Sequence, residues 1–194
     1  MNEYKLNNVI KSSNIRSLNP TTRENSDNLN YGDGIGAQFS KFIYDNKPYS
    51  HFITITFAIN ISMEKCCKYT SMLLRWVNRK IFGRSCIAKG EFIEGFAFVE
   101  NHKSGISKND LHLHLLLKPS YRFNDFRQHE LEDIIETCAA KIYHGNKLHV
   151  FNAKGIDVTV PWDDGVIGYC LKQIRHQNFD RIKLLGESGL SDEL

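Results

Sequence analysis

Two histidines separated by a single residue stand inside a run of leucines, in the stretch DLHLHLLLKPS at 110–120. Successive side chains of a β-strand point to opposite faces, so His112 and His114 would share one face and the leucines the other. The leucine face is typical of a protein core. Two imidazoles on one strand face can bind the same cation, which makes them half of a metal site.

A third ligand for such a cation is available on the preceding strand. Glu100 ends the segment GEFIEGFAFVE (90–100), and the polar turn at 101–110 predicts an antiparallel hairpin between this segment and the histidine strand. A His-His-Glu set leaves coordination positions open, as a catalytic site requires. The alternative is that both histidines simply cover a solvated face of the sheet.

A second polar group recurs at helical spacing in GYCLKQIRHQ (168–177). One face of this helix would carry Tyr169, Lys172, Gln173 and His176. Tyrosine beside lysine suits attack on a phosphodiester, because the ammonium stabilises negative charge and the deprotonated phenol is a nucleophile. The ordinary pKa of a phenol is ~10, so a metal or an ammonium must assist it. The alternative is a solvated helix face without chemistry.

The rest of the sequence predicts the elements that position these residues. Alternation and aromatic or β-branched content predict strands at 49–58, 90–100 and within 110–120, and two short ones at 148–151 and 155–161. Amphipathic spacing predicts helices at 62–83, 123–145 and 163–177. Ser62 and Gly83 can cap the first helix, and Asn124 the second. With 155–161 as the strand that follows the second helix, the order is β-α-β-β-α-β-α. This order indicates an α+β fold of the ferredoxin-like, split βαβ type, an antiparallel sheet with helices packed on one face.

Composition divides the chain into three regions. Residues 1–48 are rich in Asn, Ser and Gly and predict a polar, partly disordered N-terminal arm, whose scattered aromatic residues could dock on the domain. Residues 49–183 form the domain, and residues 184–194 a polar C-terminal tail. Within the arm, YGDGIG (31–36) is more typical of a flexible turn than of a phosphate loop, because no strand clearly precedes it and no helix clearly follows.

The bulk properties are those of an ordinary globular protein. The 194 residues are 41% hydrophobic and carry a formal net charge of +3, which identifies no binding partner. The five cysteines contain no CxxC pair and indicate reduced, buried thiols. No secretory signal core is present, and no apolar run approaches the ~18 residues of a membrane span. We therefore expect a soluble, cytoplasmic protein.

Three short motifs in order add to this picture: FITITF (52–57), HLHLLL (112–117) and YCLK (169–172). Together they resemble the three motifs of the HUH endonucleases. Within that superfamily the chain is most similar to the rolling-circle replication initiators, the Rep proteins of small plasmids, phages and phage satellites. The resemblance covers about 49–177.

The resemblance implies a role for each matching residue. His112, His114 and Glu100 match the ligands of a divalent cation, Mg²⁺ or Mn²⁺. Tyr169 matches the nucleophile that attacks a phosphate of single-stranded DNA, and Lys172 matches the lysine of the same motif. Such an enzyme nicks an origin strand or hairpin, forms a 5′-phosphotyrosine and frees a 3′-OH for a polymerase. Because no P-loop helicase motif follows, a host helicase would unwind the DNA.

Three alternatives remain open at this stage. Gln173 also makes the last motif read YxxxQ, which resembles single-tyrosine transposases of insertion sequences, where the glutamine completes the metal site. Lys172 and Glu100 favour the replication initiator. A non-enzymatic nucleic-acid-binding module with exposed aromatic residues would explain the predicted topology without the histidines. A hydrolase of small phosphoesters would use the cation and have no need of Tyr169.

Basic residues suggest where DNA would lie. After the tyrosine motif we expect DNA contacts from Arg175, His176, Arg181 and Lys183. The helix predicted at 62–83 and the residue that follows it add Lys65, Lys68, Arg75, Arg79, Lys80 and Arg84. Tyr121 could stack on a base, whereas Trp76 is better explained as a core residue. The alternative for these stretches is a solubilising basic surface.

Overall fold

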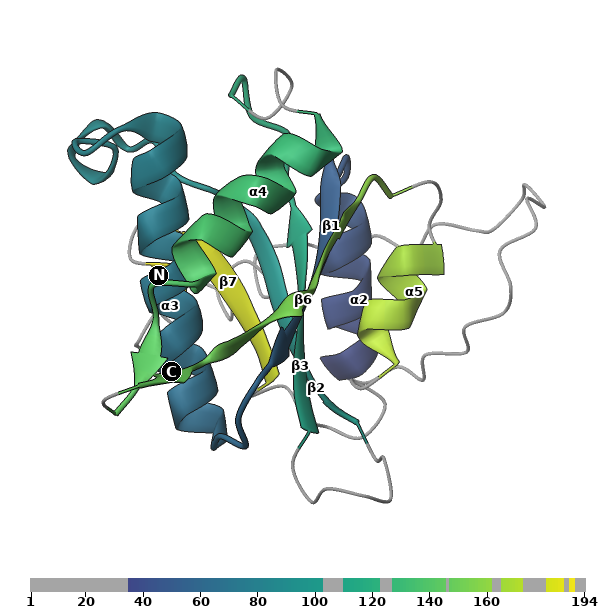
Figure 1. Ribbon diagram of the computed structural model, residues 1–194. Helices are drawn as coiled ribbons and strands as arrows, with labels where there is room; N and C mark the ends of the chain where they lie inside the picture. The colour runs from purple at the N-terminus through teal and green to yellow at the C-terminus, as the bar shows by residue number, and fades with distance from the viewer. Residues whose placement is uncertain are drawn as a thin grey trace, which may run out of the picture.

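The computed structural model describes residues 35–102, 110–122, 127–145, 147–161, 165–172, 181–186 and 189–190. These residues form a six-stranded sheet covered by helices and a separate two-stranded sheet (Figure 1). All pairs of neighbouring strands are antiparallel. The predicted α+β class and the antiparallel sheet are confirmed.

The large sheet has the strand order β6-β1-β3-β2-β7-β8. Its strands are β1 (His51–Phe57), β2 (Gly95–His102), β3 (Asp110–Leu117), β6 (Phe151–Thr159), β7 (Ile182–Gly186) and β8 (Gly189–Leu190). The helix α3 (Met63–Phe82) connects β1 to β2, and α4 (Gln128–Ala139) connects β3 to β6. Because β3 lies between β1 and β2, the segment from β1 to β6 has the element order of a split βαβ unit.

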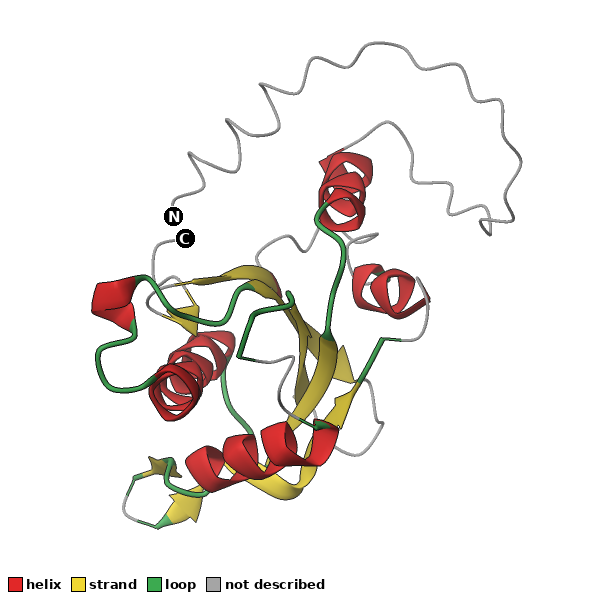
Figure 2. Ribbon diagram, turned by 90° about the horizontal axis from the view of Figure 1, so that it is seen from above, coloured by secondary structure: helices red, strands yellow, loops and turns green. Residues whose placement is uncertain are grey.

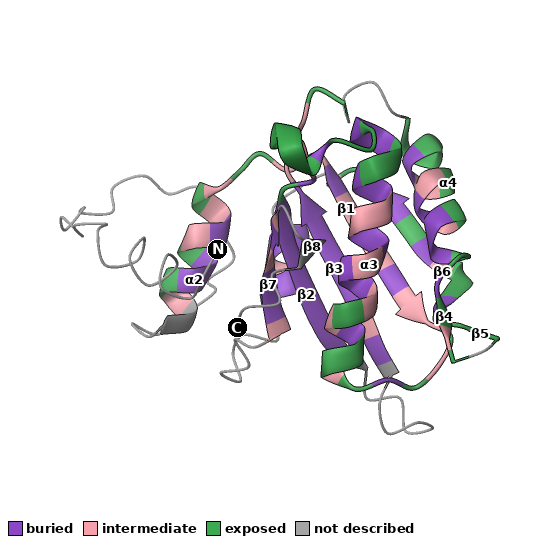
Figure 3. Ribbon diagram, turned by 90° about the vertical axis from the view of Figure 1, so that its left-hand side faces the viewer, coloured by how far each residue is buried: buried purple, intermediate pink, exposed green. Residues whose placement is uncertain are grey.

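Helices cover both faces of this sheet, whereas the sequence predicted helices on one face. Figure 2 shows α3 and α4 on one side, and on the other side α2 (Ile35–Asp45) and α5 (Gly165–Leu171). Each face therefore has its own buried apolar cluster. Figure 3 shows the strands largely buried between α2 and the pair α3 and α4.

The alternation of the histidine strand explains the first cluster. Four leucines of β3 point toward α3 and α4 and are buried there: Leu111, Leu113, Leu115 and Leu117. The helix α3 matches this apolar face with its own buried stripe, which includes Leu73 and Val77. Ser62 accepts a hydrogen bond from the Lys65 amide at the start of α3, and Gly83 ends the helix with a φ of 92°, as expected.

The helix α2 is an element that the sequence analysis missed, because it lies within the arm predicted at residues 1–48. Phe39 and Ile43 of α2 are buried against the sheet and α5, and the Tyr49 hydroxyl donates to the Ile43 carbonyl over 2.5 Å. The apolar spacing of this segment is helical, but it spans only three turns within a polar stretch. The docking of aromatic residues on the domain is thus observed, and residues 1–34 lie outside the described part.

Several predicted boundaries change. The domain does not end at residue 183, because β7 continues to Gly186 and β8 follows it within the predicted tail. The helix predicted at 123–145 begins at Gln128, after an Arg127 amide that donates to Glu130 over 2.7 Å; Asn124 lies outside the described residues. Its predicted end instead forms β4 (Tyr143–His144), which pairs with β5 (Leu148–His149). The strand predicted from residue 90 begins at Gly95, where a side chain would collide with the Leu116 carbonyl on β3.

The cysteines agree with the expectation of reduced, mostly buried thiols. All five cysteines are free thiols, and four of them are buried. None of the helices in the described part of the chain has the length and apolar character needed to cross a membrane.

The buried face of α2 makes a first testable prediction. Ile43→Ala removes a fully buried side chain, so we expect the free energy of unfolding to fall by about 2–4 kcal/mol. Lys41→Ala, on the exposed side of the same helix, should change it by less than about 0.5 kcal/mol. Urea titration followed by circular dichroism measures both. Equal, small losses would mean that α2 does not belong to the folded domain.

Candidate active site

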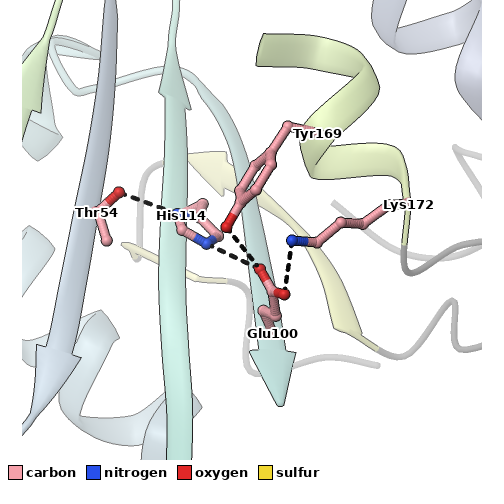
Figure 4. Close-up of polar contacts among 5 residues, drawn as sticks. All are labelled: Thr54, Glu100, His114, Tyr169 and Lys172. Carbon is pink, nitrogen blue, oxygen red and sulfur yellow. Dashed lines mark hydrogen bonds and ion pairs between the residues drawn. The ribbon is translucent and has the colours of Figure 1, made fainter. Parts of the chain in front are cut away.

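The candidate residues meet on the sheet face that α2 and α5 cover. Glu100 of β2 stands directly opposite His112 of β3, and His114 stands opposite Thr54 of β1. The helix α5 lies over this face and brings Tyr169 toward it from a part of the chain more than 50 residues beyond β3. Figure 4 shows the side chains of Tyr169, Glu100 and His114 converging.

Glu100 is the centre of this group. The Nε2 of His114 lies 3.1 Å from its Oε2, and the Tyr169 hydroxyl donates to the same oxygen over 3.2 Å (Figure 4). The other oxygen, Oε1, lies 2.8 Å from the Lys172 ammonium. Glu100 is only 7% exposed, and a carboxylate at such depth needs partners of this kind for both oxygens.

The imidazole of His114 is held on three sides. The Oγ1 of Thr54 lies 3.1 Å from Nδ1, opposite the nitrogen that faces Glu100. The Phe52 ring stacks on the imidazole at 5.3 Å between centroids and 15° between planes. The Tyr169 ring meets it edge-on at 5.2 Å and 82°. The orientation of this ring is therefore set by packing as well as by hydrogen bonds.

Tyr169 and Lys172 interact with each other as the helical spacing predicted. The Lys172 Nζ lies 3.6 Å from the centroid of the Tyr169 ring, a cation–π contact. Tyr169 is 43% exposed, so a substrate can reach it.

Cys170, next to Tyr169, faces the core instead, where burial, together with the charge of Glu100, raises the pKa of its thiol to about 12. The thiol is therefore protonated at neutral pH.

The environment sets the charge of each group. Burial alone would raise the pKa of the Glu100 carboxyl, but hydrogen bonds and charges from Lys172 and His114 lower it below the ordinary value. Burial lowers the pKa of the His114 imidazole, and Glu100 only partly opposes this effect. Burial would lower the pKa of Lys172, but Glu100 and Tyr169 raise it. At neutral pH the site thus holds a carboxylate, a neutral imidazole and an ammonium.

The predicted cation ligands share this face, and two of them, His114 and Glu100, are in contact. Within the described ranges, no three His, Cys, Asp or Glu side chains are grouped so that they could hold a metal ion. The chemistry of the donors nevertheless fits one, because a cation requires a neutral imidazole and an ionised carboxylate. Thr54 contacts Nδ1 of His114, while Nε2 faces Glu100. Metal-binding histidines usually have such a hydrogen-bond partner on the ring nitrogen that does not bind the metal, and Thr54 has this position.

The predicted DNA contacts are only partly described. Gln173, Arg175 and His176 lie outside the described residues, and Arg181 is half-buried just before β7. The predicted DNA contact of Lys183 is wrong, because this side chain is buried on the side of the sheet that faces α3. The alternation of β7 turns Ile182 toward the α5 side and therefore Lys183 away from it.

The basic helix α3 also lies away from the site, because it covers the opposite face of the sheet from Tyr169. Trp76 packs partly buried against that core, as expected. Tyr121 is 59% exposed, and its hydroxyl donates to Glu91 over 2.8 Å. The candidate site and the basic surface of α3 are therefore on different sides of the molecule.

Sequence reasoning missed Phe52 and Thr54 as parts of the site. Their signal was present in FITITF, where alternation places Phe52, Thr54 and Thr56 on one strand face. That this face is shared with the histidines depends on the pairing of β1 with β3, which the alternation does not reveal.

Comparisons with models of known protein families, with curated proteins and with solved structures find no match for this chain.

The charge of Glu100 makes the second testable prediction. In Glu100→Gln the size of the side chain remains, but the charge is lost and an amide NH2, which cannot accept a hydrogen bond, replaces one carboxylate oxygen. We therefore expect the free energy of unfolding at pH 7 to fall by about 1–3 kcal/mol. Because the folded protein lowers the pKa of this carboxyl, its contribution is present above the ordinary value of 4.5 and is lost as the pH falls through the folded value. The difference between wild type and variant should therefore shrink toward pH 3.

Urea titrations at pH 7 and pH 3 measure this difference. Glu91→Gln is the matched control, because Glu91 accepts a hydrogen bond from the exposed Tyr121 and takes no part in the site. An equal loss at both pH values would show that the Glu100 charge does not stabilise the fold.

Proposed function

We propose that this protein is a metal-dependent tyrosine endonuclease of the HUH type, which nicks single-stranded DNA at a replication origin and initiates rolling-circle replication. One observation carries the proposal: the hydroxyl of a partly exposed tyrosine bonds to a buried carboxylate that also binds a histidine and a lysine. These groups come from β2, β3 and α5, the elements to which the resemblance assigns them.

Tyr169 is the nucleophile in this proposal. Its hydroxyl loses its proton and its oxygen attacks the scissile phosphorus. A bond to the 5′-phosphate forms, the bond from phosphorus to the 3′-oxygen breaks, and the 3′-oxygen takes up a proton. The 3′-OH that leaves can prime a polymerase, or it can attack the phosphotyrosine and rejoin the strand. The hydrogen bond to Glu100 orients the phenol before the reaction.

Lys172 supports this step by its charge. Its ammonium lies against the Tyr169 ring and is held there by Glu100, so it stabilises a phenolate and the negative charge that develops on the phosphate. This contact favours the replication initiator over the transposase, in which the glutamine of YxxxQ completes the metal site. The matching residue, Gln173, lies outside the described residues.

His112, His114 and Glu100 are the proposed ligands of Mg²⁺ or Mn²⁺. When bound, such a cation acts as a Lewis acid toward the scissile phosphate. The neutral state of His114 and the ionised state of Glu100 suit both residues for this role. Single-stranded DNA or an origin hairpin is the proposed partner, with a host helicase and a polymerase completing replication.

The competing functions fit the geometry less well. A nucleic-acid-binding module that stacks bases on its sheet needs exposed aromatic residues there. The aromatic residues Phe96 and Phe98 lie on the face of the site and are at most 4% exposed, because α2 and α5 cover them. A hydrolase of small phosphoesters would leave the contacts between Tyr169, Glu100 and Lys172 without a purpose.

The third testable prediction concerns the nucleophile. Single-stranded oligonucleotides that cover the DNA flanking the gene are incubated with protein and Mn²⁺ or Mg²⁺, and adducts that resist SDS are counted on a gel. We expect a metal-dependent adduct that EDTA prevents and that Tyr169→Phe reduces at least about 1,000-fold, because no other group replaces the phenol oxygen.

Tyr143→Phe is the matched control, since Tyr143 is similarly exposed but lies on β4, in the separate two-stranded sheet. It should form the adduct at the wild-type level. DNA binding without an adduct would instead favour the binding module, and metal-dependent phosphate release that survives Tyr169→Phe would favour the hydrolase.

The fourth testable prediction concerns the histidines. His112→Ala and His114→Ala each remove a proposed ligand, so both Mn²⁺ affinity and adduct formation should fall at least about 100-fold. Electron paramagnetic resonance of free Mn²⁺ measures the affinity. His149→Ala, on the exposed strand β5, should leave both quantities unchanged. A histidine variant that nicks normally would sink the proposed metal site.

A further inference from the structure

Each histidine of the site stands opposite a threonine. The register of β1 against β3 pairs Thr54 with His114 and Thr56 with His112. Because both strands alternate with the same period, all four side chains share the face that α5 covers. The two pairs therefore hold equivalent register positions, two residues apart along the strands.

The first pair is in contact. The Thr54 Oγ1 lies 3.1 Å from the His114 Nδ1 (Figure 4). A hydroxyl can both donate and accept, so it serves either neutral form of the ring. It can donate to Nδ1 while Nε2–H donates to Glu100. It can also accept from Nδ1–H, which frees the lone pair of Nε2 for a cation.

The second pair contains a hydroxyl, that of Thr56, whose hydrogen-bonding capacity is unused within the described part of the chain. The Thr56 Oγ1 is buried and has no hydrogen-bond partner among the described residues. It lies 1.7 Å from the position that a side-chain carbon of residue 155 would take, so only Gly155 leaves room for it. A buried hydroxyl without a partner destabilises a fold. Rotation about one side-chain bond would redirect this hydroxyl within the face that it shares with His112.

We propose that Thr54 and Thr56 are the positioning residues of the histidine pair, with Thr54 orienting His114 and Thr56 orienting His112 for a divalent cation. The inference rests on the metal site of the proposed function and assigns a role to the motif FITITF. A residue that hydrogen-bonds the ring nitrogen remote from the metal sets the tautomer and the direction of a ligating imidazole. Loss of such a residue typically weakens metal binding about 10- to 100-fold.

The test uses isosteric variants of the full-length protein. Thr54→Val and Thr56→Val remove only the hydroxyl and keep the branched shape that suits a strand. Thr54→Ser and Thr56→Ser restore the hydroxyl. Thr70→Val is the matched control, because it changes a buried threonine of α3 on the opposite face of the sheet. Thermal unfolding confirms that each variant folds.

Two readouts are taken without DNA. Mn²⁺ affinity is measured by electron paramagnetic resonance, and the tautomers of His112 and His114 are read from ¹⁵N chemical shifts of the metal-free protein. We expect each Val variant to weaken Mn²⁺ binding about 10- to 100-fold, and both Ser variants and Thr70→Val to bind like the wild type. Thr54→Val should also change the tautomer ratio of His114.

The outcomes separate this inference from the proposed function. Unchanged Mn²⁺ affinity in both Val variants, with DNA binding alone reduced, would overturn the positioning role and make the threonines DNA contacts. An equal loss of Mn²⁺ affinity in Thr70→Val would also overturn the positioning role, because the loss would then follow from reduced stability of the fold. If the wild type shows no Mn²⁺ binding that depends on the histidines, the proposed metal site fails. The proposal that Thr54 and Thr56 orient the histidines for a cation then fails as well. The ¹⁵N spectra in that case report only whether Thr54 orients His114.

Discussion

A buried negative charge on Glu100 is the constraint on which the site depends. The carboxylate lies within the sheet face, where an unpaired charge would strongly destabilise the fold. It is compensated by His114 from β3, by Tyr169 of α5 and by Lys172, the residue that follows α5. One charge thus draws together segments far apart in the chain, and it orders the group that we propose as nucleophile.

The helix α5 shows how this constraint and the apolar core support each other. A seven-residue helix is too short to be stable by itself in water. Its buried residues, among them Ile167 and Leu171, pack against the cluster that α2 completes. Tyr169 and Lys172 then bond to Glu100 from the other side of the helix. Loss of α2 packing would therefore affect the position of Tyr169 without touching the site.

The site divides its groups by exposure in a way that suits nucleophilic chemistry. The groups that must keep a defined protonation state, Glu100 and His114, are buried. Tyr169, which would meet a large substrate under the proposed function, is 43% exposed. The basic helix α3 is on the opposite face of the sheet. Its charges therefore do not lie on the face that carries Tyr169.

Local patterns in the sequence determined the alternation of leucine and histidine in β3, the caps of α3 and the contact between Tyr169 and Lys172. These depend on residues a few positions apart, whose geometry follows from the period of a strand or helix. Only the tertiary structure decided that Thr54 faces His114, that Lys183 is buried and that α2 completes the second core. Each of these depends on which distant segments pair, and strand register and packing between distant elements are not written in any local period.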